Sequence, residues 1–192
     1  MDRKPLFDAV RPMLGRGFTD DEVDVIDRAI DRMVARQPHV VGELGRALIR
    51  KWEGCGRRRS DGMFAAYPDP GSADGSPWTI GWGATGPGIG PGTRWSTAQC
   101  DTRLEEDLAR YAAEVAAAIG SASTTQNQFD ALVSFHYNTG RIASATLTAK
   151  HNAGDHAGAR AEFGRWVRND GAVLRGLVRR REDEAALYGS SE

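Results

Sequence analysis

The sequence has 192 residues, of which 40% are hydrophobic and 27% charged, and its formal net charge is −1. These values fit one soluble globular domain, with or without a small appendage, and give no general reason to expect binding to nucleic acid or to a membrane. Residues 157–181 hold seven arginines against Glu162 and Asp170. These arginines could form a basic patch that attracts an anionic polymer. More commonly, such arginines are simply solvated on helix surfaces.

The first residues predict a protein that is made and folded in the cytoplasm. No apolar stretch of about 7–15 residues follows the start, as a secretory signal requires. No run approaches the roughly 20 apolar residues of a membrane span, so we expect no stable membrane insertion. A substrate outside the membrane would then require a separate protein to release this one.

Residues 1–40 predict a helical hairpin. Apolar residues recur at helical spacing from Leu6 to Leu14, and Gly15 ends that pattern. Thr19-Asp-Asp-Glu22 has the form of a capping box that opens a second amphipathic helix. Such a hairpin is too small to hold a stable core alone. We therefore expect an appendage over residues 1–40 beside a domain that spans residues 41–192.

A third helix is predicted from about Gly42 to Trp52, and the helical period is lost beyond it. Asp61-Gly62 and Asp74-Gly75 are hairpin signals, and residues 78–82 can form a strand. We therefore predict a small antiparallel sheet lobe with long loops over about residues 54–95.

Helices return after this lobe. Ser96-Thr-Ala-Gln99 is a capping box that opens a long helix to about Ile119, and Thr124 or Thr125 caps the next helix, which ends near Gly140. Shorter helices are expected at about 144–152, 155–168 and 174–188. The predicted fold is α+β, in which a long helix joins the sheet lobe to a larger helical lobe and a cleft lies between them.

Cys55 and Cys100 are the only cysteines. Two cysteines are too few for a structural zinc site without histidines, and no histidine has suitable spacing, so we expect no metal site. A disulfide formed after release and two reduced, half-buried thiols both stay open, and the thiols are the simpler expectation.

Glu53 is the candidate for acid chemistry. It ends the third helix at the joint between the lobes, where the helix C-terminus and apolar neighbours such as Trp52 favour a protonated carboxyl, as a general acid requires. Asp69 is held between two prolines, and Thr79 begins the candidate strand. Taken alone, each has an ordinary explanation: a frayed helix end, a turn and a strand residue. Together they suggest glycoside hydrolysis, in which one carboxyl protonates the leaving oxygen and other polar groups handle water.

Aromatic residues surround these positions. They could stack on sugar faces or fill a core, and we expect core positions for at least two of them: Trp52, Tyr67, Trp78 and Trp82.

Several motifs in one order resemble phage-type lysozymes, glycoside hydrolase family 24. They cover roughly residues 42–190 and read Trp52-Glu-Gly54, Ala66-Tyr-Pro-Asp-Pro70, Trp78-Thr-Ile-Gly-Trp-Gly-Ala-Thr85, Gln128-Phe-Asp-Ala-Leu-Val-Ser-Phe-His-Tyr-Asn-Thr-Gly140, Phe163-Gly-Arg-Trp166, Gly176-Leu-Val-Arg-Arg-Arg181 and Glu184. The resemblance implies a lysozyme-like fold and an endolysin, a muramidase that acts without metal or organic cofactor.

The resemblance also implies roles. Glu53 would protonate the glycosidic oxygen between N-acetylmuramic acid and N-acetylglucosamine in peptidoglycan. Asp69 and Thr79 would position a water and stabilise the oxocarbenium-like transition state, with inversion at the anomeric carbon. The protein would be a monomer that stays in the host cytoplasm until a membrane-permeabilising protein releases it to the periplasmic cell wall.

The resemblance also bears on six further residues. Asn138 and Gly140 would form a substrate-binding turn near the cleft, or simply a helix C-cap. Arg175 is a further candidate for substrate binding. Arg180 and Glu184 are four apart and would form a structural pair, while either Arg175 or Arg180 could instead reach Glu53. Trp166 is expected in the core.

The sequence departs from the family at three places. Residues 57–62 look inserted between Glu53 and Asp69, which leaves Asp74 as an alternative partner for Glu53. Ala84 stands where the family usually has a structural histidine. Residues 1–40 lie outside the family, either as a packing appendage or as a module that binds the wall or a partner.

Two other activities remain as alternatives. A lytic transglycosylase would use a glutamate without water, but the presence of Asp69 and Thr79 argues against it. An inactive peptidoglycan-binding protein of the same fold would need a broken catalytic set, whereas all three residues are present.

Overall fold

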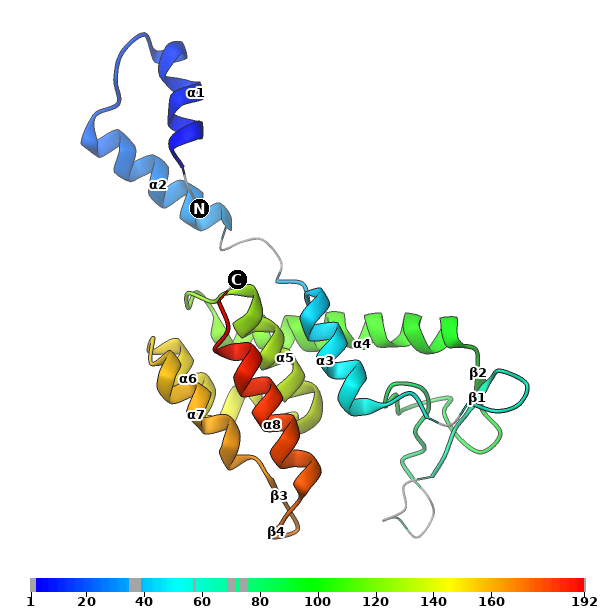
Figure 1. The fold of residues 1–192 in the computed structure, drawn as a ribbon. Helices are drawn as coiled ribbons and strands as arrows, with labels where there is room; N and C mark the ends of the chain where they lie inside the picture. Colours follow the sequence, from blue (N-terminus) through cyan, green and yellow to red (C-terminus); the bar gives the residue numbers. More distant parts are fainter. Residues whose placement is uncertain (1–2, 35–38, 57, 69–71, 73–75, 192) are drawn as a thin grey trace. The chain divides into compact units, whose positions relative to one another are not determined.

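A computed structural model describes residues 3–34, 39–56, 58–68, 72 and 76–191 (Figure 1). The chain divides into two compact units, Met1–Pro38 and His39–Glu192. Among the described residues, no helix combines the length and the apolar character needed to cross a membrane. In the same part of the chain, no three His, Cys, Asp or Glu side chains gather where they could hold a metal ion.

The first unit contains α1 (Lys4–Leu14) and α2 (Asp20–Val34). α1 ends because Gly15 adopts the left-handed conformation, with φ of 67°. The predicted capping box opens α2: the Glu22 amide donates to Thr19 Oγ1 at 3.3 Å, and the Thr19 amide donates to Glu22 Oε2 at 3.0 Å. Both predicted helices are confirmed.

The second unit holds the remaining elements. Its helices are α3 (Glu43–Glu53), α4 (Thr97–Ile119), α5 (Gln126–Thr139), α6 (Thr146–Asn152), α7 (His156–Glu162) and α8 (Arg175–Tyr188), with 3₁₀ turns η1 (Ile142–Ser144) and η2 (Phe163–Arg165). Its strands are β1 (Phe64–Ala65), β2 (Arg94–Trp95), β3 (Arg168–Asn169) and β4 (Ala172–Val173).

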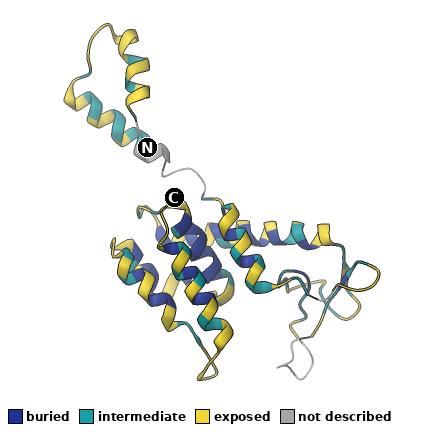
Figure 2. Ribbon diagram, in the orientation of Figure 1, coloured by how far each residue is buried: buried dark blue, intermediate teal, exposed yellow. Residues whose placement is uncertain are grey.

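The core of this unit is built around α5, which packs against α3, α4 and α8. Phe129, Leu132 and Phe135 on α5 are fully buried, and Figure 2 shows α5 as one of the most buried elements. Capping boxes at Ser96 and Thr125 open α4 and α5. Of the two threonines predicted as the cap of α5, Thr124 and Thr125, the cap is therefore Thr125. The helical lobe is therefore confirmed.

The sheet lobe consists mostly of loops, and its two strands have only two residues each. β1 pairs antiparallel with β2, and isolated bridges join Tyr67 to Thr79 and Ile80 to Ala84. The predicted strand over residues 78–82 is wrong: of these described residues only Thr79 and Ile80 make isolated bridges, and no strand forms there. Gly81 and Gly83 have φ of 60° and 87°, which turns the chain back so that Ile80 pairs with Ala84.

Two hairpin signals have different outcomes. At Asp61-Gly62 the Gly62 amide donates to the Arg59 carbonyl at 3.0 Å, which confirms a turn there. Asp74-Gly75 lies outside the described residues.

A second hairpin replaces the end of the helix predicted at 155–168. α7 and η2 end by Arg165, and β3 pairs with β4 across Asp170 and Gly171. These two residues have φ of 47° and 80°. Consecutive left-handed residues are typical of a two-residue hairpin turn, so the sequence Asn-Asp-Gly was a signal that the prediction missed.

Candidate functional site

Glu53 is the last residue of α3. The next residue, Gly54, has a φ of 61°, which ends the helix, and the sheet lobe with its many turns begins there. The Glu53 side chain is 19% exposed, and its Oε1 accepts a hydrogen bond from Arg180 Nη1 at 2.7 Å. The carboxyl faces a pocket of about 170 Å³ whose other lining residues come from the sheet lobe, α4 and α5: Gly83, Thr85, Arg103, Asp107, Arg110, Tyr111, Tyr137 and Asn138.

Arg180 is fixed by three groups at once. Besides Glu53, its Nε donates to Glu184 Oε1 at 3.0 Å and its Nη2 donates to the Ser134 carbonyl at 3.2 Å. Arg180 and Glu184 are both buried. The two roles that the sequence left open for Arg180 therefore coexist, because one guanidinium pairs with Glu184 and also holds Glu53.

Arg181 extends this buried cluster to the pocket wall. Its Nη2 donates to Glu184 Oε1 at 2.9 Å and to Asn138 Oδ1 at 3.0 Å. Burial raises the pKa of Glu184 and lowers the pKa of Arg181, which is the electrostatic cost of holding charges out of water. Two residues that line the pocket, Glu53 and Asn138, thus depend on one buried charge cluster.

Thr79 lies on the sheet-lobe side. Its amide donates to the Tyr67 carbonyl at 2.9 Å and its carbonyl accepts from the Tyr67 amide at 2.9 Å. Burial and the nearby negative charge of Glu53 raise the pKa of Tyr67, which places this phenol in the electrostatic field of the carboxyl. Asp69, two residues beyond Tyr67, and its alternative Asp74 both lie outside the described residues.

The other two predicted substrate-binding residues, Gly140 and Arg175, are not among the described residues that line the pocket with Glu53. Gly140 caps α5, with φ of 64° and an amide that donates to the His136 carbonyl at 2.7 Å. Arg175 is the first residue of α8, and its side chain is exposed. A second pocket of about 510 Å³ adjoins the first at Asn138 and includes Trp166 and Leu174. Trp166 is partly buried and packs against the main core.

The aromatic residues divide between packing and surface. Trp82 packs against the core around α5 and against a second, smaller cluster in the sheet lobe, made of Phe64, Ile80, Ala84 and Cys100. Its Nε1 donates to Asp101 Oδ1 at 2.8 Å. Trp52 donates from Nε1 to Asp183 Oδ2 at 2.9 Å, so its indole is tied to α8. Tyr67 is exposed and Trp78 half-buried.

The two cysteines are free thiols, with Cys100 buried and Cys55 half-buried. The pKa of Cys55 is raised to about 12, mainly by burial and to a smaller extent by the neighbouring Cys100 thiol.

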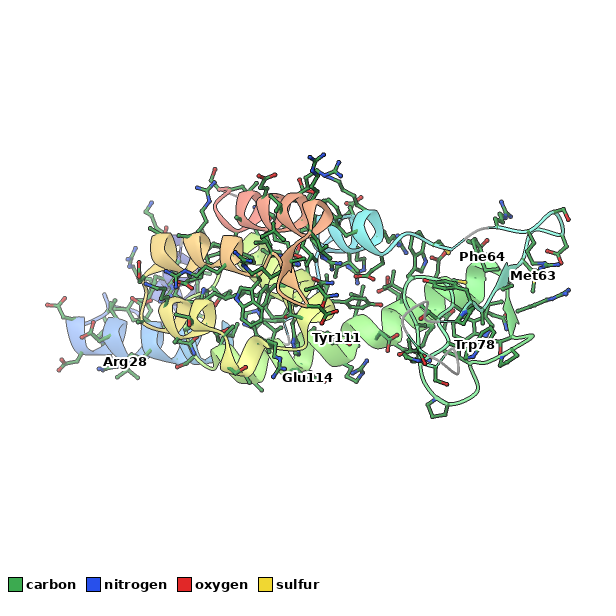
Figure 3. The ribbon with its side chains drawn as sticks, turned by 90° about the horizontal axis from the view of Figure 1, so that it is seen from below. Arg28, Met63, Phe64, Trp78, Tyr111 and Glu114 are labelled. Atoms are coloured by element: carbon green, nitrogen blue, oxygen red, sulfur yellow. The ribbon has the colours of Figure 1, made fainter. Side chains whose placement is uncertain are left out.

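The α4 side of the pocket was not predicted from the sequence. Arg103, Asp107 and Arg110 are spaced at i, i+4 and i+7, next to the buried face of Leu104 and Leu108. A charged stripe beside a buried face was a signal that could have identified them. Figure 3 shows Tyr111 and Glu114 further along α4 beside the helical lobe, with Phe64 and Trp78 in the sheet lobe.

Comparison with known proteins gives a consistent family. The sequence profile described as Phage lysozyme matches residues 50–184. The endolysin of Bacillus phage PZA is 43% identical over 152 residues, which cover 78% of this chain and 55% of that protein. The endolysin of Lactococcus phage c2 is 36% identical over 152 residues, covering 77% of this chain and 59% of the relative. This chain therefore spans little more than half the length of these relatives.

A solved structure supports the same fold. The muramidase domain of SpmX from Asticaccaulis excentricus superposes with a TM-score of 0.67 at 29% identity, over 80% of this chain and 99% of that domain.

Proposed function

The chain belongs to the phage lysozyme family, and we propose that it is an endolysin-type muramidase that hydrolyses peptidoglycan glycan strands. The proposed bond is the β-1,4 linkage between N-acetylmuramic acid and N-acetylglucosamine. The observation that carries the proposal is the placement of Glu53: a partly exposed carboxyl that faces a pocket at the joint between a sheet lobe and a helical lobe.

Glu53 is the proposed general acid. Its Oε1 is engaged by Arg180, so Oε2 is the oxygen that would carry the proton to the glycosidic oxygen. Arg180 thus holds the acid in place.

Asp69 and Thr79 are the proposed water-handling groups. The backbone bridge between Thr79 and Tyr67 supports this assignment, because it holds Thr79 beside the segment that leads to Asp69. In an inverting reaction these groups would activate or orient a water on the face of the sugar opposite Glu53. The proposed reaction uses no metal or organic cofactor.

Asn138 is the proposed sugar-binding group, since its side chain lines the pocket with Glu53. Gly140 would support it by ending α5 two residues later. Arg175 follows Leu174, which lines the adjoining pocket, and is proposed to contact an outer part of the polymer.

We further propose that the protein works as a monomer on the periplasmic wall after a membrane-permeabilising protein has released it, with residues 1–40 as an appendage of the catalytic domain. Expression in the cytoplasm should then leave cells intact until the membrane is permeabilised with chloroform. Lysis that starts without permeabilisation would contradict the release step.

The direct test of the acid compares Glu53→Gln with the wild type on dye-labelled Gram-negative sacculi. Loss of a general acid should lower the rate by about 10²–10⁴-fold. Glu43→Gln is the matched control, because Glu43 is an exposed glutamate at the opposite end of α3. Equal rates for Glu53→Gln and the wild type would contradict the assignment, and Asp69→Asn and Thr79→Ala extend the same test to the water-handling groups.

A further inference from the structure

The turn over residues 81–85 is held from outside at three points. Arg103 Nη2 on α4 donates to the Thr85 carbonyl at 2.9 Å. Tyr137 on α5 donates its hydroxyl to the Trp82 carbonyl at 2.9 Å. The Trp82 indole donates to Asp101 Oδ1 on α4 at 2.8 Å. Both ends of this short turn are therefore tied to the two helices that form the far wall of the pocket.

Arg103 is itself oriented by a buried carboxylate. Its Nε donates to Asp107 Oδ2 at 3.0 Å, while Arg110 Nη2 donates to Asp107 Oδ1 at 3.1 Å. Asp107 is only 7% exposed. Because both carboxylate oxygens are engaged, Asp107 has little freedom to rotate, and the Arg103 guanidinium is directed at the turn.

The middle of the turn lies directly against the proposed acid. A Cβ atom on Gly83 would stand 3.0 Å from Glu53 Oε2. Arg180 holds the other carboxyl oxygen, so the Glu53 carboxyl is confined between Arg180 and the turn. Any outward movement of the turn would open space beside Oε2, the oxygen proposed to carry the proton.

The hydroxyl that holds Trp82 keeps its donor role across the working pH range. Burial raises the pKa of Tyr137 well above its usual value, so its phenol stays protonated. The contact at Trp82 is therefore constant, and the contact at Thr85 is the one made by a charged side chain, that of Arg103.

We propose that Arg103, oriented by Asp107, is a positioning residue of the reaction: it fixes the 81–85 turn and thereby keeps the Glu53 carboxyl in its reactive position. This inference rests on the proposed function. The plain alternative is an ordinary i, i+4 ion pair on α4 that has no influence on the chemical step.

The test compares Arg103→Met and Arg103→Lys with Arg46→Met as the matched control. Arg46 also bonds one α4 carboxylate, Glu105, and one backbone carbonyl, that of Val41, but it does not touch the turn. Each variant is assayed for kcat and KM on a soluble peptidoglycan glycan, for thermal stability, and for hydrogen exchange of the Ala84 amide, which donates to the Ile80 carbonyl at 3.0 Å.

Arg103→Met should lower kcat by about 10–100-fold with KM changed less than about twofold, as a small misplacement of a reacting group does. It should also speed exchange at Ala84. Arg103→Lys should recover part of kcat, and Arg46→Met should keep it. Should Arg103→Met fail to fold, Asp107→Asn provides the same comparison, with a smaller loss expected because the amide oxygen still accepts from Arg103.

An Arg103→Met enzyme with wild-type kcat, or a loss of kcat that Arg46→Met reproduces, overturns the positioning role. Unchanged exchange at Ala84 overturns it as well. Failure of the proposed function would give a different result. In that case the wild type itself would release no glycan fragments, while hydrogen exchange at the Ala84 amide would still respond to substitution of Arg103.

Discussion

Replacing Glu184 by glutamine should strongly destabilise the second unit. The Glu184 side chain is fully buried and receives hydrogen bonds from Ser134 Oγ at 2.8 Å, Arg180 Nε at 3.0 Å and Arg181 Nη2 at 2.9 Å. Arg181 Nε lies 2.8 Å from the second carboxylate oxygen. The amide removes the only negative charge in direct contact with both buried guanidinium groups among the described residues, and its NH₂ group replaces an acceptor.

The size of the effect follows from the loss of one partner in a buried ion cluster, which costs about 3–5 kcal/mol because the remaining charges stay buried. For a unit of about 150 residues, each kcal/mol shifts the melting temperature by about 2–4 °C. We therefore expect Glu184→Gln to lower the melting temperature by roughly 6–20 °C, measured by circular dichroism at pH 7.

Glu182→Gln is the control for this substitution. Glu182 lies on the same helix but is exposed, so its loss should change stability by less than about 0.5 kcal/mol. If Glu184→Gln and Glu182→Gln melted at the same temperature, the buried cluster would not stabilise the fold as argued. Glu184→Gln should also reduce activity at temperatures where it is folded, since Arg180 would lose one of the groups that orient it toward Glu53.

Three further predictions concern the turn, a histidine and the thiols. Gly83→Ala should abolish most sacculus digestion, whereas Gly88→Ala should retain it: both glycines have φ above 80°, but only a Cβ at position 83 meets Glu53, and equal activities would contradict this contact. Burial and the neighbouring His156 lower the pKa of His151 to about 4, so between about pH 6.5 and 4 the unfolded chain binds a proton that the folded chain does not. The free energy of unfolding should therefore fall by up to about 3 kcal/mol as the pH drops through that window. In urea titrations His151→Gln should show a smaller fall, and an unchanged slope would refute it. The raised pKa of Cys55 and the burial of Cys100 predict slow reaction of both thiols with Ellman's reagent at pH 8 until the chain is unfolded, and rapid reaction of the folded protein would contradict that.

Local signals predicted the helices well. The boxes at Thr19 and Ser96 mark helix starts because the side chains satisfy amides that have no helical partner, and this depends only on residues three positions apart. The same locality explains why Glu53 could be placed at the joint between the lobes from the glycine that follows it.

Nonlocal contacts could not be predicted in this way. The strand expected over residues 78–82 does not form because Gly81 and Gly83 reverse the chain. The resulting turn is stabilised by hydrogen bonds from Arg103 and Tyr137, which lie on helices distant in the sequence. Likewise, the sequence allowed either Arg175 or Arg180 to reach Glu53, since both lie on α8. The packing of α8 against α5 decides for Arg180, whose guanidinium also meets the Ser134 carbonyl.

The most direct test of the central claim is the chemistry of the cut ends. Sacculi digested with the wild type and with Glu53→Gln are reduced with borohydride, and the fragments are weighed by mass spectrometry. The wild type should release fragments that end in reduced N-acetylmuramic acid, and Glu53→Gln should release almost none. Fragments with 1,6-anhydro ends, which borohydride does not reduce and which are lighter than the reduced fragments by one water and two hydrogens, would contradict hydrolysis by this carboxyl. An identical yield from Glu53→Gln would contradict it as well.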